Sequence, residues 1–448
     1  MNKEKQLYIV KKIVTADNAD SVFENCALEV SGGIITGILN YSNELKQNFD
    51  GKVFDYGNLV LVPGFIQTHI HLCQTLFRGL ADDLLLLDWL QNRIFPFENA
   101  HNRESLQASC RLGINELLAG GTTTLLDMGT LRHQDAVFEE LKNAGMRAFA
   151  GNCLMDQNEL YPDFKMTAAD NLKYTYEIAK TYHNYTDRLR IGFAPRFVLS
   201  CSEGLLRDVK AMSAEFPGSL MHTHSSENMG EIETVRRMTG KENIEYFDSI
   251  GFLDDRTVLA HCIHLNEKEI KTLKKHDTRV SHCPSSNLKL GSGIAGIPGF
   301  IEEGISVSIG ADGAPCNNNL SVFTEMRLAA LIQKPVRGPQ SMDAKTVFRM
   351  ATIEGAKALH IEKETGSIEV GKKADFVLLN LETADQPLIQ DNVYSSIVYS
   401  SSKENVKHVF IQGEQKVENG KVLFYDENEI RAQGKEELKK LIGRMLKN

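Results

Sequence analysis

The sequence lacks the long apolar runs of a membrane protein. Its longest candidate, LLLLDWL at residues 84–90, is far shorter than the roughly 20 apolar residues of a membrane-spanning helix, and Asp88 interrupts it. The first residues, MNKEKQLYIVKKIV, have neither the apolar core nor the small-residue cleavage site of a signal peptide. These absences lead us to expect a cytoplasmic protein.

Runs of positive charge are also missing. The formal net charge is −9 at pH 7, and lysine and arginine form no cluster. Proteins that bind nucleic acid or anionic membrane surfaces usually carry basic patches. We therefore expect neither partner, and a small neutral or polar ligand is the more natural interpretation.

Cysteine pairs of the C-x-x-C type are absent as well. The eight cysteines are scattered along a chain of 448 residues, which is long enough to build a core without disulfide bonds. We expect reduced and mostly buried thiols. The 42% apolar and 24% charged composition is that of an ordinary globular protein, with room for one large domain and a smaller accessory.

The two ends of the chain share a β-rich texture that the middle lacks. Short β-type runs split by Gly, Asn and Asp fill residues 1–60, and a similar pattern fills 366–425. We expect the two segments to combine into one small β-sandwich domain, although a separate sheet at each end is an alternative. Residues 426–448 are predicted to form a surface helix.

The middle segment, residues 61–365, alternates short β-branched or apolar runs with longer helical patterns. Eight such alternations predict a (β/α)8 barrel, an α/β fold of the TIM type. In that fold the catalytic residues lie at the carboxyl ends of the strands. The predicted strands are VLVPGFIQTHIH, TTTLLDMG, RAFAGNCLM, RIGFAPRF, SLMHTHSSE, TVLAHCIHL, TRVSHCPSSN and ISVSIGADG.

Polar residues gather at the ends of several of these strands. His69 and His71 end the first strand, and residues two apart on a strand point to the same side. In a chain with 13 histidines such a pair is weak evidence alone. The later strands supply more candidates, which are His222, His224, Glu227, His261, His264 and Asp312.

Three histidines and one aspartate with an open position fit Zn²⁺ or Fe²⁺. Either His222 or His224 could be the third histidine ligand, because they share a face. His264 and His282 are more easily explained as structural residues. Asp312, which precedes Gly313, would by itself be explained as a turn residue.

The chemistry of this set is hydrolytic. A divalent metal lowers the pKa of bound water from 15.7 towards about 7. Asp312 could bind the metal and accept a proton from that water, while His261 steadies the hydroxide. Glu227 could carry a proton to a ring nitrogen and then to the leaving group. The fourth strand, RIGFAPRFVLS, ends without a lysine that could bridge a second metal, so one metal is predicted.

These motifs resemble those of the metal-dependent amidohydrolase superfamily, in the branch of adenosine-type deaminases, guanine deaminase and triazine hydrolases. The resemblance covers nearly the whole chain and rests on PGFIQTHIHLCQTLFRGLADDLLLLDWL, HTHSSE, LAHCIHL, SHCPSSNLKL and GADGAPCNNNLSVFTEMRLAALIQK. It implies one divalent metal per subunit, Zn²⁺ before Fe²⁺, and an assembly of identical chains. The implied metal ligands are His69, His71, His224 and Asp312.

The resemblance also implies roles for the remaining site residues. Glu227 would be the proton shuttle and His261 the partner of the hydroxide or oxyanion. Glu98, in FPFENA, matches an acid that binds ribose hydroxyls in nucleoside deaminases, and a carboxylate can accept two vicinal hydroxyls. Arg196 departs from the histidine of many nucleoside deaminases and is closer to guanine deaminases.

The first expectation for the substrate is an adenine nucleoside, namely 5'-deoxyadenosine, methylthioadenosine or S-adenosylhomocysteine. Deamination would give the inosine analogue and ammonia. Guanine, another aminated heterocycle or a chlorotriazine is the alternative, with Arg196 contacting the base. A metal-stabilised binding protein without turnover is the third possibility. The segment LLLLDWLQNRIFPF, at 84–97, is either a lid or an apolar helix packed on the barrel.

Overall fold

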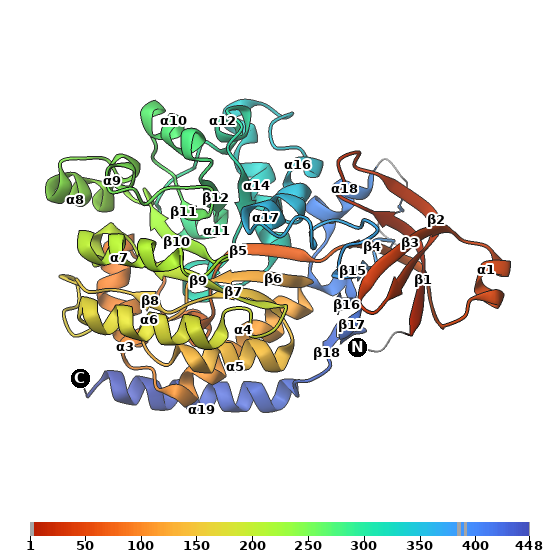
Figure 1. The fold of residues 1–448 in the computed structure, drawn as a ribbon, viewed down its shortest axis with the longest axis horizontal. Helices are drawn as coiled ribbons and strands as arrows, with labels where there is room; N and C mark the ends of the chain where they lie inside the picture. The colour runs from red at the N-terminus through yellow and green to blue at the C-terminus, as the bar shows by residue number, and fades with distance from the viewer. Residues whose placement is uncertain (1–3, 383–386, 389–391, 448) are drawn as a thin grey trace. The chain divides into compact units, whose positions relative to one another are not determined.

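The computed structural model describes residues 4–382, 387–388 and 392–447 (Figure 1). A few residues of the expected terminal segments, 1–3, 383–386, 389–391 and 448, lie outside the described part. The chain forms two compact units. One contains the chain up to Ile66, Asn115–Thr124 and Ser321–Tyr425, and the other contains Gln67–Ile114, Leu125–Leu320 and the segment from Asp426 onwards.

A closed ring of parallel strands confirms the predicted barrel. Eight strands follow one another around the ring, the last of them in two short pieces, β13 and β14. Because β13 pairs with β12 and β14 pairs with β5, the eighth strand closes the ring. A further short strand, β8 (Cys153–Leu154), pairs with β9. The ring strands are β5 (Phe65–His71), β6 (Thr122–Asp127), β7 (Arg147–Ala150), β9 (Leu189–Pro195), β10 (Leu220–Ser225), β11 (Thr257–His261), β12 (Arg279–His282), β13 (Val307–Ile309) and β14 (Asp312–Gly313).

Hydroxyl groups join the first strand to the last two. Thr68 Oγ1 on β5 lies 2.7 Å from Ser281 Oγ on β12 and 2.7 Å from Ser308 Oγ on β13. All three side chains are buried, so each hydroxyl needs a partner inside the protein. The cluster therefore fixes the register where the ring closes.

Helices follow the barrel strands, as the alternating pattern predicts (Figure 1). Local chemistry sets their ends: α10 begins with a capping box between Asn266 and Glu269, and α5 ends at Gly145 in the left-handed conformation. The helices up to Asn317 are α2 (Leu86–Trp89), α3 (Phe95–Asn99), α4 (Arg103–Ala119), α5 (Gln134–Ala144), α6 (Ala168–Tyr182), α7 (Glu203–Ser213), α8 (Met229–Thr239), α9 (Asn243–Ser249), α10 (Glu267–His276), α11 (Pro284–Lys289), α12 (Ile297–Glu302) and α13 (Ala314–Asn317).

The two ends of the chain meet in one mixed sheet, as expected, and not in two separate sheets. The order is β18-β17-β16-β15-β4-β1-β2-β3, and the antiparallel pair β4·β15 joins N-terminal to C-terminal strands. These strands are β1 (Lys5–Val14), β2 (Val22–Ser31), β3 (Ile34–Asn40), β4 (Lys52–Pro63), β15 (Phe376–Leu379), β16 (Val406–Ile411), β17 (Glu414–Glu418) and β18 (Lys421–Val422). The same unit contains α1 (Asn43–Asn48), α14 (Val322–Ile332), α15 (Lys334–Arg337), α16 (Ala344–Met350), α17 (Ile353–Ala358) and α18 (Val393–Ser395).

One predicted strand is divided between the two sheets. The run VLVPGFIQTHIH supplies the end of β4, where Val60 pairs with Leu379, and then all of β5. The break falls at Pro63 and Gly64. Proline has no N–H to continue a ladder, and a Cβ on Gly64 would lie 2.1 Å from Thr123 Oγ1, so a glycine is required at this close approach.

The chain ends in a long helix, α19 (Glu427–Met445). Its buried residues include Ile430, Gly434 and Leu441, and Gly434 packs closely against Leu112. Arg444 donates hydrogen bonds to the Ala100 carbonyl and to Asn102, which ties this helix to the start of α4. None of the helices in the described chain combines the length and apolar character needed to cross a bilayer.

We predict that Phe376→Ala lowers the free energy of unfolding by about 3–5 kcal/mol, because the cavity removes the contacts of a fully buried ring. Phe376 stacks on Phe410 at 4.5 Å and meets the edge of Tyr8 at 5.0 Å. Urea unfolding measures the change. The control is Leu423→Ala at a side chain that is 52% exposed, and equal midpoints for the two variants would contradict the prediction.

Candidate metal and catalytic site

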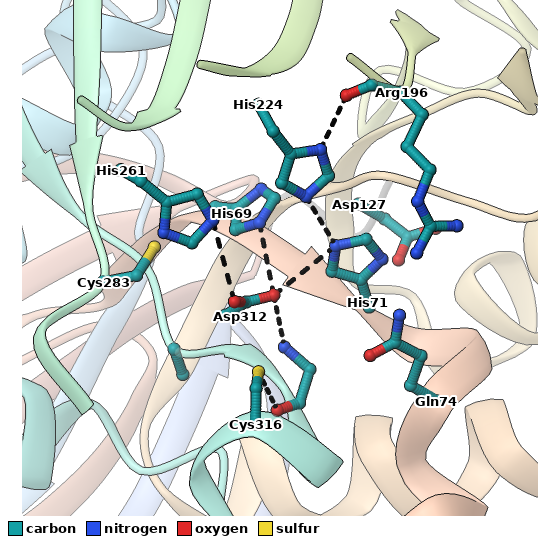
Figure 2. A network of polar contacts seen from close by, with 12 residues as sticks. His69, His71, Gln74, Asp127, Arg196, His224, His261, Cys283, Asp312 and Cys316 are labelled. Carbon is teal, nitrogen blue, oxygen red and sulfur yellow. Dashed lines mark hydrogen bonds and ion pairs between the residues drawn. The ribbon is translucent and has the colours of Figure 1, made fainter. Parts of the chain in front are cut away.

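The predicted histidines and Asp312 converge at the carboxyl ends of four barrel strands (Figure 2). His69 and His71 come from β5, His224 from β10, His261 from β11 and Asp312 from β14. The positions are far apart in sequence but neighbours in space because the ring closes between β14 and β5. The structure therefore brings together all of the residues that the sequence suggested as metal ligands.

Their facing atoms have the spacing of a ligand set. His71 Nε2 lies 3.2 Å from His224 Nε2, and Asp312 Oδ1 lies 3.3 Å from His69 Nε2 and 3.4 Å from His71 Nε2. Ligand atoms at about 2.0–2.1 Å from a tetrahedral Zn²⁺ are about 3.3 Å apart. These three distances match that spacing. Two overlapping triads, His69–His71–Asp312 and His69–His224–His261, each have ligand atoms within 4.8 Å of one another.

For His224 and His69, a contact at Nδ1 identifies Nε2 as the nitrogen that faces the site. His224 donates from Nδ1 to the Arg196 carbonyl at 2.7 Å, which leaves the Nε2 lone pair free for a metal. His222 Nε2 lies 2.8 Å from His69 Nδ1, so His222 is the hydrogen-bonded neighbour of a candidate ligand. The strand pattern alone left His222 and His224 as alternative metal ligands, and these two contacts favour His224.

The two histidines that we interpreted as structural lie apart from this ligand set. His264 Nε2 donates to the Ser292 carbonyl at 2.7 Å. His282 is buried at the end of β12, and burial lowers its pKa to about 3, with a smaller contribution from His261.

Burial determines the protonation state of the site. It lowers the pKa of His69 and lowers those of His71 and His224 much further. Burial alone would raise the pKa of Asp312, but the neighbouring histidines outweigh it and hold that pKa well below the usual range. Neutral imidazoles and an ionised carboxylate are the forms that bind a metal.

Glu227 and His261 form a second pair beside this set. Glu227 Oε2 lies 3.5 Å from His261 Nε2, and burial raises the pKa of Glu227 to about 7 even though His261 opposes the shift. Burial lowers the pKa of His261, but Glu227 and Asp312 raise it more strongly. His261 donates from Nδ1 to Asn287 Oδ1 at 2.8 Å, which turns Nε2 towards the two carboxylates.

The backbone is strained at the same places. His261 has a φ of 74° and Asp312 a φ of 63°, which lie in the left-handed region that non-glycine residues seldom adopt. Such conformations cost about 1–3 kcal/mol each and collect at functional sites. Both residues end a barrel strand, so the strained backbone sets the direction in which their side chains leave the ring.

A pocket opens onto these groups. Its polar part is lined by seven side chains, which are His71, Gln74, Arg196, His224, Glu227, His261 and Asp312. Its apolar part comes from the segment 84–97, Phe197 and Leu290. Within that segment Leu86, Trp89 and Leu90 are almost fully buried, so here it is a packed helix that forms one wall of the pocket.

Two functional candidates were not identified in the sequence. Gln74 lines the pocket, and its Oε1 has no hydrogen-bond partner among the described residues. Asp127 ends β6, accepts a hydrogen bond from Leu72 N at 2.9 Å, and has its pKa raised by burial to about 7. The acid near the end of the predicted strand TTTLLDMG was a usable signal for Asp127, whereas Gln74 lies inside an apolar run and gave none.

The structure pairs Glu98 and Arg196 with each other. Arg196 Nη1 donates to Glu98 Oε2 at 2.7 Å and Nη2 donates to Oε1 at 3.2 Å. Arg196 lines the pocket, and Glu98 is not among the lining residues. The two candidate substrate-binding residues therefore lie at different depths.

Comparison with known proteins gives a consistent result. A model of the Amidohydrolase family matches residues 60–416. The chain is 38% identical over 426 residues, 93% of this chain and 94% of the relative, to a 5-methylthioadenosine/S-adenosylhomocysteine deaminase from Thermodesulfovibrio yellowstonii. A zinc-bound adenosine deaminase from Xanthomonas campestris has a TM-score of 0.91 at 28% identity, covering 98% of both chains. A guanine deaminase from C. acetobutylicum with bound guanine has a TM-score of 0.84 at 26% identity, covering 92% of this chain and 99% of that one.

We predict that the metal-free protein binds one equivalent of Zn²⁺ and that His224→Ala weakens this binding at least about 100-fold, because loss of a ligand costs more than loss of an outer partner. Competition with a chelator measures the affinity. The control is His276→Ala on the surface of α10, where the imidazole pairs with Asp248. Equal affinities for the two variants would refute the ligand assignment.

Proposed function

The chain belongs to the amidohydrolase family, and from this premise we propose that it is a metal-dependent hydrolytic deaminase of an adenine nucleoside. The observation that carries the proposal is the position of Glu227, a buried acid with a pKa of about 7, 3.5 Å from His261 Nε2 at the edge of the histidine and Asp312 cluster. The deaminase name of the 38% identical relative gives the substrate class.

His69, His71, His224 and Asp312 would hold one divalent ion, with Zn²⁺ preferred and Fe²⁺ the alternative. The spacing of their donor atoms fits such an ion, and the zinc in the adenosine deaminase neighbour agrees with this preference. The chemistry that the ion supplies when bound is acidification of water, from a pKa of 15.7 towards about 7.

The residues of the chain provide the proton transfers. Asp312 accepts a proton as water attacks C6 of the purine, and Glu227 donates a proton to the ring nitrogen N1. His261 stabilises the oxygen at C6 through Nε2. The ionised Glu227 then receives the proton that Asp312 took from water and passes it to the amino group, which breaks the C6–N bond. The proton of the C6 hydroxyl returns to Glu227 as the carbonyl forms. The balance is one water consumed, one ammonia released and a C6 carbonyl formed.

Within this class we propose 5'-deoxyadenosine as the first substrate. The apolar wall of the pocket, built from Leu86, Trp89, Leu90, Phe197 and Leu290, suits a nucleoside whose 5' carbon has no polar group. Methylthioadenosine and S-adenosylhomocysteine have longer 5' substituents. A second cleft that shares Phe197 with the pocket would accommodate them.

A cytoplasmic location and an assembly of identical chains complete the proposal. All eight cysteines are free and buried, which suits a reducing compartment. The assembly is the arrangement that the family resemblance implies, and a small purine substrate remains the expected partner.

Guanine is the second candidate substrate, supported by one observation. Arg196 and Gln74 both line the pocket, so a guanidinium that donates and an amide group that can donate and accept hydrogen bonds lie on its polar side. That pair complements a carbonyl oxygen next to an N–H, which guanine has and adenine lacks. A chlorotriazine is a weaker alternative, because a likeness to triazine hydrolases at 21% identity supports the fold alone.

We predict that the zinc-loaded enzyme releases ammonia from 5'-deoxyadenosine faster than from adenosine or guanine, since the apolar wall has no partner for a 5' hydroxyl. Ultraviolet assays on these three compounds, with methylthioadenosine, S-adenosylhomocysteine and a chlorotriazine added, measure kcat/KM. Preference for guanine over every nucleoside would overturn the first choice. Inactivity on all six would favour a binding protein without turnover.

We predict that Glu227→Gln lowers kcat by about 10²- to 10⁴-fold, because general acid–base catalysis contributes about that factor. Zinc content should stay unchanged, since Glu227 is outside the ligand set. The control is Glu233→Gln, an exposed position on α8, the helix that follows Glu227 in the chain. Full turnover by the Glu227 variant with metal bound would show that Glu227 is not the proton shuttle.

A further inference from the structure

Both oxygens of the Glu98 carboxylate are already hydrogen-bonded. Oε1 accepts from Gln74 Nε2 at 2.8 Å and from Arg196 Nη2 at 3.2 Å, and Oε2 accepts from Arg196 Nη1 at 2.7 Å. The side chain is completely enclosed and does not line the catalytic pocket. To bind two ribose hydroxyls, Glu98 would have to break a buried bidentate ion pair.

Arg196 depends on this carboxylate. Its guanidinium is 4% exposed and lies 5.0 Å above the ring of Phe95, so water does not compensate its charge. A buried cation without a counter-charge is strongly unfavourable. Glu98 supplies the counter-charge through two parallel hydrogen bonds from Nη1 and Nη2 to its two oxygens. This bidentate contact also fixes the orientation of the guanidinium plane.

Arg196 in turn holds a candidate metal ligand. Its main-chain carbonyl accepts hydrogen bonds from His224 Nδ1 at 2.7 Å and from His224 N at 3.0 Å. Figure 2 shows the Arg196 carbonyl facing His224, while the guanidinium extends towards His71 and Gln74. A displacement of Arg196 would therefore change both the orientation of His224 and the lining of the pocket.

We propose that Glu98 is a positioning residue that fixes Arg196 and Gln74 at the edge of the pocket and, through Arg196, orients His224, without contacting the ribose. The inference rests on the proposed function for its substrate. It assigns the polar edge of the pocket to the side chains of Arg196 and Gln74. The ribose hydroxyls are then recognised elsewhere.

The kinetic test compares Glu98→Gln with a matched control. Glu140→Gln makes the same change at another buried acid, whose oxygens accept from Arg111 at 2.8 and 3.0 Å outside the pocket. The substrates are 5'-deoxyadenosine and its 2',3'-dideoxy analogue, which lacks the ribose hydroxyls.

We expect Glu98→Gln to lower kcat/KM roughly 10- to 100-fold, by the same factor on both substrates, as is typical when an outer partner of a metal ligand is lost. Glu140→Gln should leave kcat/KM within about twofold of wild type, because Arg111 and Glu140 lie outside the site. A loss confined to the substrate with hydroxyls would identify Glu98 as a ribose ligand and overturn the proposal. Equal effects of the two variants would overturn it as well.

The Arg196→Gln background tests whether Glu98 acts through Arg196. Once the cation is absent, Glu98→Gln should cost little further, so the double variant should resemble Arg196→Gln. Two neutral side chains also leave no unpaired buried charge, which protects folding. Additive losses would show that Glu98 acts independently of Arg196 and would contradict the proposal.

Zinc affinity gives a readout that does not depend on the substrate. Chelator competition should show roughly tenfold weaker Zn²⁺ binding by Glu98→Gln and no change for Glu140→Gln, because only Glu98 is linked to His224. If wild type deaminates neither nucleoside, the proposed function fails, and the zinc measurement still decides the role of Glu98. Unchanged zinc affinity would then overturn that role.

Discussion

Closure of the barrel between β14 and β5 is the constraint on which the site depends. Asp312 pairs with Ile70 and Gly313 with His71, so the last strand delivers a carboxylate beside the two histidines of the first. The closure leaves no room for a side chain at residue 313, where a Cβ would lie 2.0 Å from Gln74 Oε1. Because Gly313 has no side chain, β14 can pair with β5 while Gln74 keeps its position in the pocket wall.

Burial then gives these residues their chemistry. An enclosed imidazole stays neutral and an aspartate among histidines stays ionised, which prepares the donors for a cation. The same enclosure raises the pKa of Glu227 to about 7, where a carboxyl group can both donate and accept a proton. Part of the cost is visible in the left-handed backbone of His261 and Asp312, which folding must offset elsewhere.

The sequence predicted the barrel, the terminal sheet and the position of the candidate site because each depends on local patterns. Alternating apolar runs mark strands, and polar residues at their ends mark one edge of the barrel. Two features escaped prediction: the division of one strand at Pro63 and the pairing of Glu98 with Arg196. Each depends on contacts between segments distant in sequence, which no local pattern encodes.

The central claim is that four side chains from three separate strands hold one metal at the mouth of the barrel. Anomalous diffraction from a crystal of the zinc-loaded enzyme, collected at the zinc absorption edge, tests it most directly. The account predicts one peak bounded by His69, His71, His224 and Asp312, with His261 and Glu227 beside it. A peak elsewhere in the chain, or ligation by His222 in place of His224, would contradict it.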